Sequence, residues 1–176
     1  MSLAFTPEVK ILIDCGVSYC SAKKSLAELD VDIDDVDAVL VTHEHMDHVA
    51  GLPKFLEHNK KAVVFVHEKG AKALEVRVAP PPQRVRNFSA PFVFNGVAVD
   101  FYVCSHDSAF CCGFKITENA TGKSVASVTD TGYVNGEFDS FVKDCEAVVI
   151  ESNYDETMLR SVSYTHLRAH ETSQDL

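Results

Sequence analysis

The sequence predicts an α/β protein, and three observations support this class. Short apolar runs rich in β-branched residues recur along the chain, among them residues 10–14 and 38–41, and they have the length of buried strands. Segments with apolar residues at helical spacing lie between several of these runs, as an α/β fold requires. Four of the runs are followed by a histidine or an aspartate. Strand ends that meet at one rim of a sheet would bring these polar side chains together.

The composition fits a single domain of ordinary hydrophobicity. The 176 residues are 46% hydrophobic and carry a formal net charge of −10, from 16 basic and 26 acidic residues. This charge argues against a broad basic surface for nucleic acid, although two bound divalent ions would restore positive charge locally. No apolar run approaches the roughly 20 residues of a membrane helix and no signal peptide begins the chain, so we expect a cytoplasmic protein without a membrane segment. The six cysteines lack CxxC spacing, which predicts reduced thiols.

The individual elements follow from periodicity and from the residues that interrupt it. We expect strands at residues 10–14, 38–41, 62–66, 97–105, 123–129 and 147–150. Helices are expected at residues 21–29, 49–56 and 70–78. The first of these helices would bury Ala22, Leu26 and Leu29. The acidic run 30–37 is interpreted as a solvated connection, and the three prolines at 80–82 begin an extended loop.

The strongest chemical signal is the run His43-Glu44-His45-Met46-Asp47-His48, which follows the strand predicted at 38–41. Residues two apart in a loop leaving a strand point to the same side, so His43 and His45 can bind one ion. Asp47 and His48 diverge at the turn into a helix, which Asp47 is placed to cap, and they suit a second ion. Histidine nitrogens with a few carboxylate oxygens are typical zinc ligands. The spacing disfavours the alternative, a polar loop with chance histidines.

Other polar residues allow two interpretations. His67 follows the strand predicted at 62–66 and could approach the ions, but a histidine satisfied within the fold is the favoured interpretation. His58 is expected to contact solvent and the dipole at a helix end. One stretch is locally basic and consists of Lys69, Lys72, Arg77, Arg84 and Arg86. Such charges usually form a solvated face, and with a polyanionic substrate they would contact phosphates.

The run at residues 43–48 matches the HxHxDH signature, and the sequence here resembles the metallo-β-lactamase fold superfamily of mostly zinc-dependent hydrolases. The resemblance implies an αββα four-layer sandwich of two mixed sheets flanked by helices, present in this chain in incomplete form. It implies two divalent metal ions, zinc or alternatively manganese, with the ligands His43, His45 and His106 for one, Asp47 and His48 for the other, and Asp130 between them. Asp14 corresponds to an aspartate that supports the ligands, although a plain turn aspartate fits the sequence equally. The seventh usual ligand, a histidine after a later strand, has no counterpart.

Within that superfamily the chain resembles the bacterial WalJ (YycJ) type, described as a DNA exonuclease acting from the 5′ end. The matching stretches extend from Lys10 to Arg160 and include the Glu-Ser-Asn-x-Asp element at residues 151–155. The expected reaction is hydrolysis of a DNA phosphodiester by a hydroxide that bridges both ions, with Asp47 orienting the hydroxide and accepting its proton. The alternative is a small-molecule thioesterase or lactonase, because the fold does not determine the substrate.

Both ends of the sequence suggest a fragment. Relatives place one or two strands before the strand at residues 10–14, whereas nine residues precede it here. Residues 161–176 resemble translated sequencing-adapter read-through. We therefore expect a partial domain at residues 1–160 and a non-native tail at 161–176, and we do not take His166 or His170 as the seventh ligand. An inactive fragment that lacks this ligand is the third hypothesis.

Overall fold

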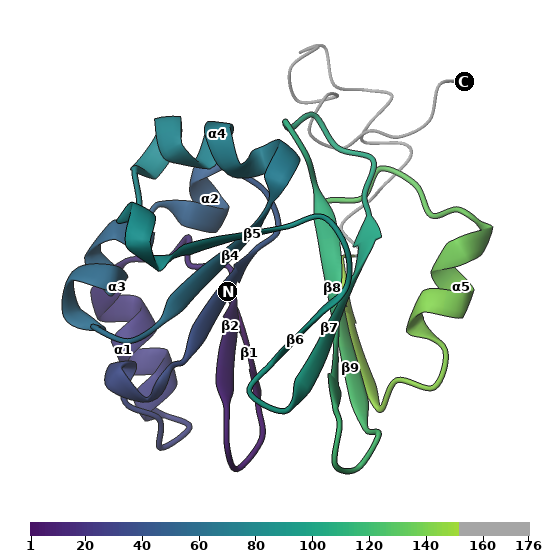
Figure 1. The fold of residues 1–176 in the computed structure, drawn as a ribbon, viewed down its shortest axis with the longest axis horizontal. Helices are drawn as coiled ribbons and strands as arrows, with labels where there is room; N and C mark the ends of the chain where they lie inside the picture. The colour runs from purple at the N-terminus through teal and green to yellow at the C-terminus, as the bar shows by residue number, and fades with distance from the viewer. Residues whose placement is uncertain (152–176) are drawn as a thin grey trace, which may run out of the picture.

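The computed structural model describes residues 1–151, which form four layers (Figure 1). Two five-stranded β-sheets face each other, with several helices outside the first sheet and, within the described residues, one helix outside the second. The αββα order expected from the resemblance is therefore confirmed. No helix within residues 1–151 has both the length and the apolar character needed to cross a membrane.

The first sheet is largely parallel. It consists, in spatial order, of β1 (Ser2–Phe5), β2 (Lys10–Ile13), β3 (Ala38–Val41), β4 (Val63–His67) and β5 (Val85–Phe88). Strand β1 is antiparallel to β2, and β2 to β5 are parallel to one another. Parallel neighbours need crossover connections. These connections contain α1 (Tyr19–Ala27), the 3₁₀ helix η1 (Ile33–Asp35), α2 (Met46–Val49), α3 (Leu52–His58), α4 (Glu68–Val78) and the 3₁₀ helix η2 (Pro82–Arg84).

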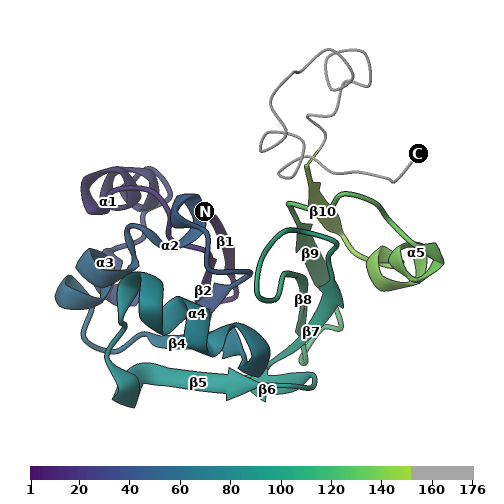
Figure 2. The same cartoon turned by 90° about the horizontal axis from the view of Figure 1, so that it is seen from above.

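The second sheet is largely antiparallel and has the order β10-β9-β8-β7-β6. Its strands are β6 (Phe92–Phe94), β7 (Val97–Val103), β8 (Cys112–Glu118), β9 (Ser124–Val128) and β10 (Ala147–Ile150). Only β9 and β10 are parallel, and α5 (Gly136–Val142) connects them. Figure 2 shows α5 outside this sheet and α1, α3 and α4 outside the first. Each sheet is thus mixed, as predicted.

Alternation along the strands divides the core into three clusters. On β2, Ile11 and Ile13 face the second sheet, whereas Leu12 faces the helices of the first. The cluster between the helices and the first sheet contains Leu52 and Phe55. A smaller cluster joins α5 to the second sheet and includes Tyr102, Val128 and Phe138. Both faces of each sheet therefore carry buried side chains, and this explains the nearly continuous apolar runs in β2 and β3.

Every strand predicted from the sequence is present, with bounds shifted by at most two residues, and α4 begins at Glu68 rather than Gly70. The structure also contains β1, β5, β6, β8 and α5, which the sequence patterns did not predict. Strand β8 was obscured by Gly113, a residue that normally weakens a strand. A Cβ at this position would lie 2.6 Å from Cγ2 of Val128, so the glycine lets β8 and β9 approach closely.

Four predictions about the segments between β2 and β4 were wrong in detail. Leu29 is 56% exposed, not inward, because α1 ends at Ala27. The acidic connection is not simply solvated, since around η1 it buries Val31, Ile33 and Val36. The single helix expected after the histidine run is two helices, α2 and α3. Asp47 lies in the first turn of α2, and the N-cap residue is His45.

Arg84 does not belong to a solvated basic face. Its guanidinium donates hydrogen bonds to the backbone carbonyl oxygens of Leu56, Asn59 and Ala62. The fully buried side chain of Asn59 lies beside it. The Asn59 amide donates to the carbonyl oxygens of Ile33 and Val36 and accepts from the N–H groups of Lys61 and Ala62. Arg84 and Asn59 thus join η1, the end of α3 and the start of β4.

We expect Asn59→Ala to lower the free energy of unfolding by about 2–3 kcal/mol, because the substitution removes the partner of several buried backbone groups at once. Urea denaturation followed by circular dichroism would measure the change. The control is Asn119→Ala, since Asn119 is exposed in the turn after β8 and its loss should cost less than about 0.5 kcal/mol. Equal effects of the two substitutions would contradict this account of Asn59.

Candidate metal centre

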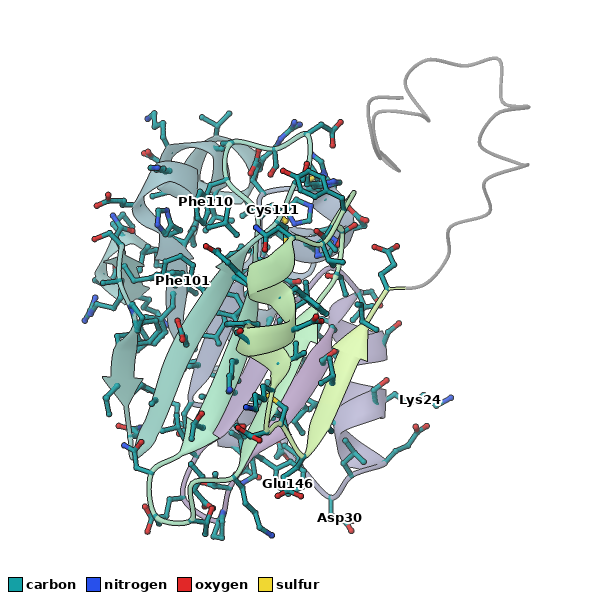
Figure 3. The ribbon with its side chains drawn as sticks, turned by 90° about the vertical axis from the view of Figure 1, so that its right-hand side faces the viewer. Lys24, Asp30, Phe101, Phe110, Cys111 and Glu146 are labelled. Atoms are coloured by element: carbon teal, nitrogen blue, oxygen red, sulfur yellow. The ribbon has the colours of Figure 1, made fainter. Side chains whose placement is uncertain are left out.

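The predicted ligands follow strands whose carboxyl ends lie at one rim of the sandwich. Asp14 follows β2 and His43 follows β3, and these strands are parallel. His106 follows β7 and Asp130 follows β9, and these strands share a direction because each pairs antiparallel with β8. Figure 3 shows this end of the molecule from the side, with Phe110 and Cys111 at the opposite end of the sheet from Glu146. The expected convergence of strand ends is confirmed.

One group of potential ligands consists of His43, His45 and His106, whose ligand atoms lie within 4.8 Å of one another. Nε2 of His106 lies 3.1 Å from Nδ1 of His45. The ring of His43 stands edge-on to both, with centroids 4.5 Å from His45 and 4.7 Å from His106. Three imidazoles from the two sheets therefore surround one small volume. They are the three histidines expected to bind the first ion.

A second group shares His43 and adds His48 and Asp130. Nε2 of His48 lies 3.1 Å from Oδ2 of Asp130 and 3.5 Å from Oδ2 of Asp47. The Asp47 side chain is 78% exposed and belongs to neither group, although its carboxylate borders the second. The two groups meet at His43. No further histidine within residues 1–151 joins either group.

His43 is the most deeply buried of these residues, with 2% exposure. Its Nε2 atom is buried and has no hydrogen-bond partner among the described residues. Burial, followed by repulsion from His48 and His106, lowers the pKa of His43 to about 3. The ring is therefore neutral near pH 7, which is the form that binds metals. Since an unpartnered buried nitrogen is costly, this group of residues fits a divalent ion.

His48 lies between two carboxylates. Its Nδ1 is 2.8 Å from Oδ2 of Asp14, and its Nε2 faces Asp130. Burial lowers the pKa of His48, but the hydrogen bonds and charges of Asp130 and Asp14 outweigh burial and raise the pKa to about 10. Burial alone would raise the pKa of Asp130. The hydrogen bond to His48 outweighs burial and holds the pKa of Asp130 below its usual range. Without a metal, His48 is thus a cation held by two anions.

The loop after β2 contacts the histidine run through its backbone. The N–H of Cys15 donates to the carbonyl oxygen of His48 at 2.8 Å, and the N–H of Gly51 donates to that of Cys15 at 2.8 Å. A Cβ at Gly16 would lie 1.4 Å from the carbonyl oxygen of Asp47, so only glycine permits this approach. The loop therefore sets the position of the second half of the histidine run.

Two of the site's aspartates have a left-handed backbone. The φ angle is 61° at Asp14 and 55° at Asp130. Aspartate tolerates this conformation better than most residues, but it still costs on the order of 1 kcal/mol. In each case the turn directly follows a strand and places the carboxylate against His48. The contacts of the charged site compensate for the local strain.

Three further residues, which the sequence motifs do not identify, support the site. The Thr42 hydroxyl lies against Asp14 and His43. The buried Glu44 accepts a hydrogen bond at 2.8 Å from the N–H of Ala109, in the loop that carries His106. Glu151 accepts one at 2.7 Å from the N–H of Asp130. Adjacency to the histidine run was the available signal for Thr42 and Glu44.

The remaining described histidines lie outside both groups. His67 accepts a hydrogen bond from the N–H of Lys69 and stacks on Phe110 with centroids 3.6 Å apart. The prediction of a satisfied structural histidine is confirmed. His58 is exposed at the end of α3, as expected, and also stacks on Tyr19. The tail at residues 161–176, with His166 and His170, lies outside the described residues.

Comparisons with known proteins agree with this geometry. The family described as "Beta-lactamase superfamily domain" matches residues 9–174. "Exodeoxyribonuclease YycJ" of Bacillus anthracis is 34% identical over 162 residues, which cover 90% of this chain and 60% of the relative. The chain thus spans about three fifths of the length of that relative.

Solved structures share the fold at low sequence identity. The metallo-β-lactamase fold protein YhfI of Bacillus subtilis has a TM-score of 0.68 and 19% identity, over 86% of this chain and 62% of the other. Zn²⁺-bound PqqB of Methylobacterium extorquens also has a TM-score of 0.68, with 17% identity, over 90% of this chain and 62% of the other. With its fold, its histidine run and the family match over most of its length, this chain belongs to the β-lactamase superfamily domain family and has the metallo-β-lactamase fold.

Proposed function

We propose that this chain is the metal-binding part of a metal-dependent phosphodiesterase that removes nucleotides from DNA as a 5′-to-3′ exonuclease. The observation that carries the proposal is the pair of ligand groups that meet at His43, in a chain 34% identical to an exodeoxyribonuclease. Two adjacent divalent ions are the usual means of hydrolysing phosphodiesters. The cytoplasmic location stays a prediction.

The proposed ligands divide between two ions. His43, His45 and His106 would bind one, His48 and Asp47 the other, and Asp130 would contact both. Zinc suits nitrogen donors with a few carboxylates, and manganese is the alternative. When bound, such ions neutralise charge on a phosphodiester and lower the pKa of a water molecule.

The chain's own residues have separate tasks in this proposal. Asp14 orients His48 through the bond to Nδ1 and so directs Nε2 into the site. Asp47 is exposed at the edge of the second group, where its carboxylate can accept a proton from the attacking water. Glu44 and Glu151 fix the backbones that carry His106 and Asp130. Residues that follow strands of both sheets thus hold the proposed ligands in place at the rim.

We expect the chain, loaded with zinc or manganese, to shorten 3′-end-labelled duplex DNA, and we expect His45→Ala and Asp47→Ala each to reduce this activity at least about 100-fold without unfolding the protein. Gel analysis of the digested DNA measures activity, and circular dichroism checks the fold. Asp100→Ala, which removes an exposed carboxylate on β7, is the matched control and should keep full activity.

Turnover of a thioester and of a lactone should be measured with the same samples. Hydrolysis of either small molecule with intact DNA would replace the nuclease proposal by the alternative on the same fold. Full nuclease activity in His45→Ala or Asp47→Ala would contradict the proposed ligands.

We also expect ion binding at the second group to release a proton and to strengthen with pH. The raised pKa keeps a proton on His48 below about pH 10, and an ion at Nε2 must displace it. The affinity should therefore rise about tenfold per pH unit between pH 7 and pH 9. Calorimetric titration in buffers of different ionisation enthalpy counts the protons released.

Two substitutions test whether the pH dependence of ion binding comes from His48 in particular. His48→Gln should abolish the pH dependence, because the displaced proton is gone. His58→Gln, at an exposed histidine stacked on Tyr19, should leave the pH dependence unchanged. An affinity independent of pH in the unsubstituted protein would show that His48 is not a ligand.

A further inference from the structure

Thr42 lies at the centre of the site's hydrogen bonds, directly before the histidine run. The residue is 3% exposed, and its N–H donates to Oδ1 of Asp14 at 2.9 Å. Its Oγ1 lies 2.9 Å from Oδ2 of Asp14, 3.0 Å from Nδ1 of His43 and 3.3 Å from Nδ1 of His48. One hydroxyl group therefore contacts the Asp14 carboxylate and the imidazoles of His43 and His48.

The direction of these hydrogen bonds follows from the number of protons. A threonine hydroxyl has one proton, and a carboxylate can only accept. If Thr42 gave its proton to His43, its oxygen and the Asp14 oxygen would face each other as two lone pairs at 2.9 Å. The hydroxyl therefore donates to Asp14, which is also the stronger, charge-assisted bond. The lone pairs of Oγ1 are left to accept from Nδ1 of His43, because Nδ1 of His48 gives its one proton to Asp14.

This assignment fixes the proton on Nδ1 of His43, since only an N–H can donate to Oγ1. Within residues 1–151, Nδ1 of His43 also lies 3.7 Å from Sγ of Cys111, a long and weak contact, and that thiol lies within reach of the carbonyl oxygen of Asp130. A neutral ring with its proton on Nδ1 carries its lone pair on Nε2. Nε2 is the buried atom of His43 that has no partner among the described residues.

We propose that Thr42 is a positioning residue that selects the tautomer of His43 and couples the charge of Asp14 to it. The chain of bonds runs from Nδ1–H of His43 to Oγ1 of Thr42, and from the Thr42 hydroxyl to Oδ2 of Asp14. Asp14 also accepts from Nδ1 of His48. One buried carboxylate thus orients both histidines, directly on one side and through Thr42 on the other. The inference rests on the ion site of the proposed function.

The test compares Thr42→Val, which keeps the shape and removes the hydroxyl, with Thr42→Ser, which keeps the hydroxyl. Thr117→Val is the matched control, because Thr117 lies toward the other end of β8 from Cys112. The first measurement is the ¹⁵N spectrum of the imidazoles in metal-free protein, with His43 assigned through His43→Gln. The second is zinc affinity, measured by competition with a chelator.

In the unsubstituted protein, in Thr42→Ser and in Thr117→Val, His43 should show the tautomer with the proton on Nδ1. Thr42→Val should show a mixture of tautomers and a zinc affinity about 10–100-fold weaker, the usual effect of losing a partner behind a metal ligand. Thr42→Ser should remain within about threefold of the unsubstituted affinity. Rescue by serine separates the hydroxyl from the packing of the side chain.

Three results would overturn the inference. One is a proton on Nε2 of His43 in the unsubstituted protein, and this readout does not depend on how Thr42→Val folds. The second is an unchanged tautomer and affinity in Thr42→Val. The third is an equal loss in Thr42→Ser, which would make the role one of packing. Absence of zinc binding in the unsubstituted chain would instead refute the proposed function, while the metal-free spectrum would still decide the role of Thr42.

Discussion

A buried carboxylate must be surrounded by hydrogen-bond donors, and the site depends on how this chain meets that requirement for Asp14. Asp14 is 4% exposed and accepts from the N–H and hydroxyl of Thr42 and from Nδ1 of His48. These donors come from the residue directly after β3 and from α2, whereas the carboxylate follows β2. Satisfying one charge therefore joins three elements at the rim. The left-handed backbone of Asp14 and the glycine at position 16 are the local conditions for this arrangement.

The fold could be predicted where a strand is buried on both faces. The run Ala38–Val41 is fully buried, and its apolar sequence identifies it as a strand. Strand β5 contains the exposed Arg86 and Asn87, and β8 contains Gly113, so neither has a clear pattern. Their place in the sheets is determined by pairing with distant strands, which a single sequence does not display. The αββα order came from the resemblance to a known family, and the apolar runs alone indicated only the α/β class.

The candidate site also contains residues that the local sequence reveals and residues that it does not. The candidate ligand residues could be predicted to lie together because their spacing within residues 43–48, and their position after strands, reflect local geometry. Their supporting residues were not, because each acts across the fold: Glu44 contacts the backbone of Ala109, and Glu151 contacts that of Asp130. Arg84 shows the opposite error. Its charge suggested a phosphate contact, whereas its hydrogen bonds to backbone carbonyls make it part of the framework.

The division of the site between two sheets has a consequence for biosynthesis. His43, His45 and His48 belong to the first half of the chain, and His106 and Asp130 belong to the second. On the ribosome, the first sheet is complete in sequence before the residues that close the site have been made. At that stage the chain lacks His106 and Asp130, so neither group of candidate ligands is complete. In the proposed ion site, the full set of donors is therefore assembled only when the second sheet docks on the first.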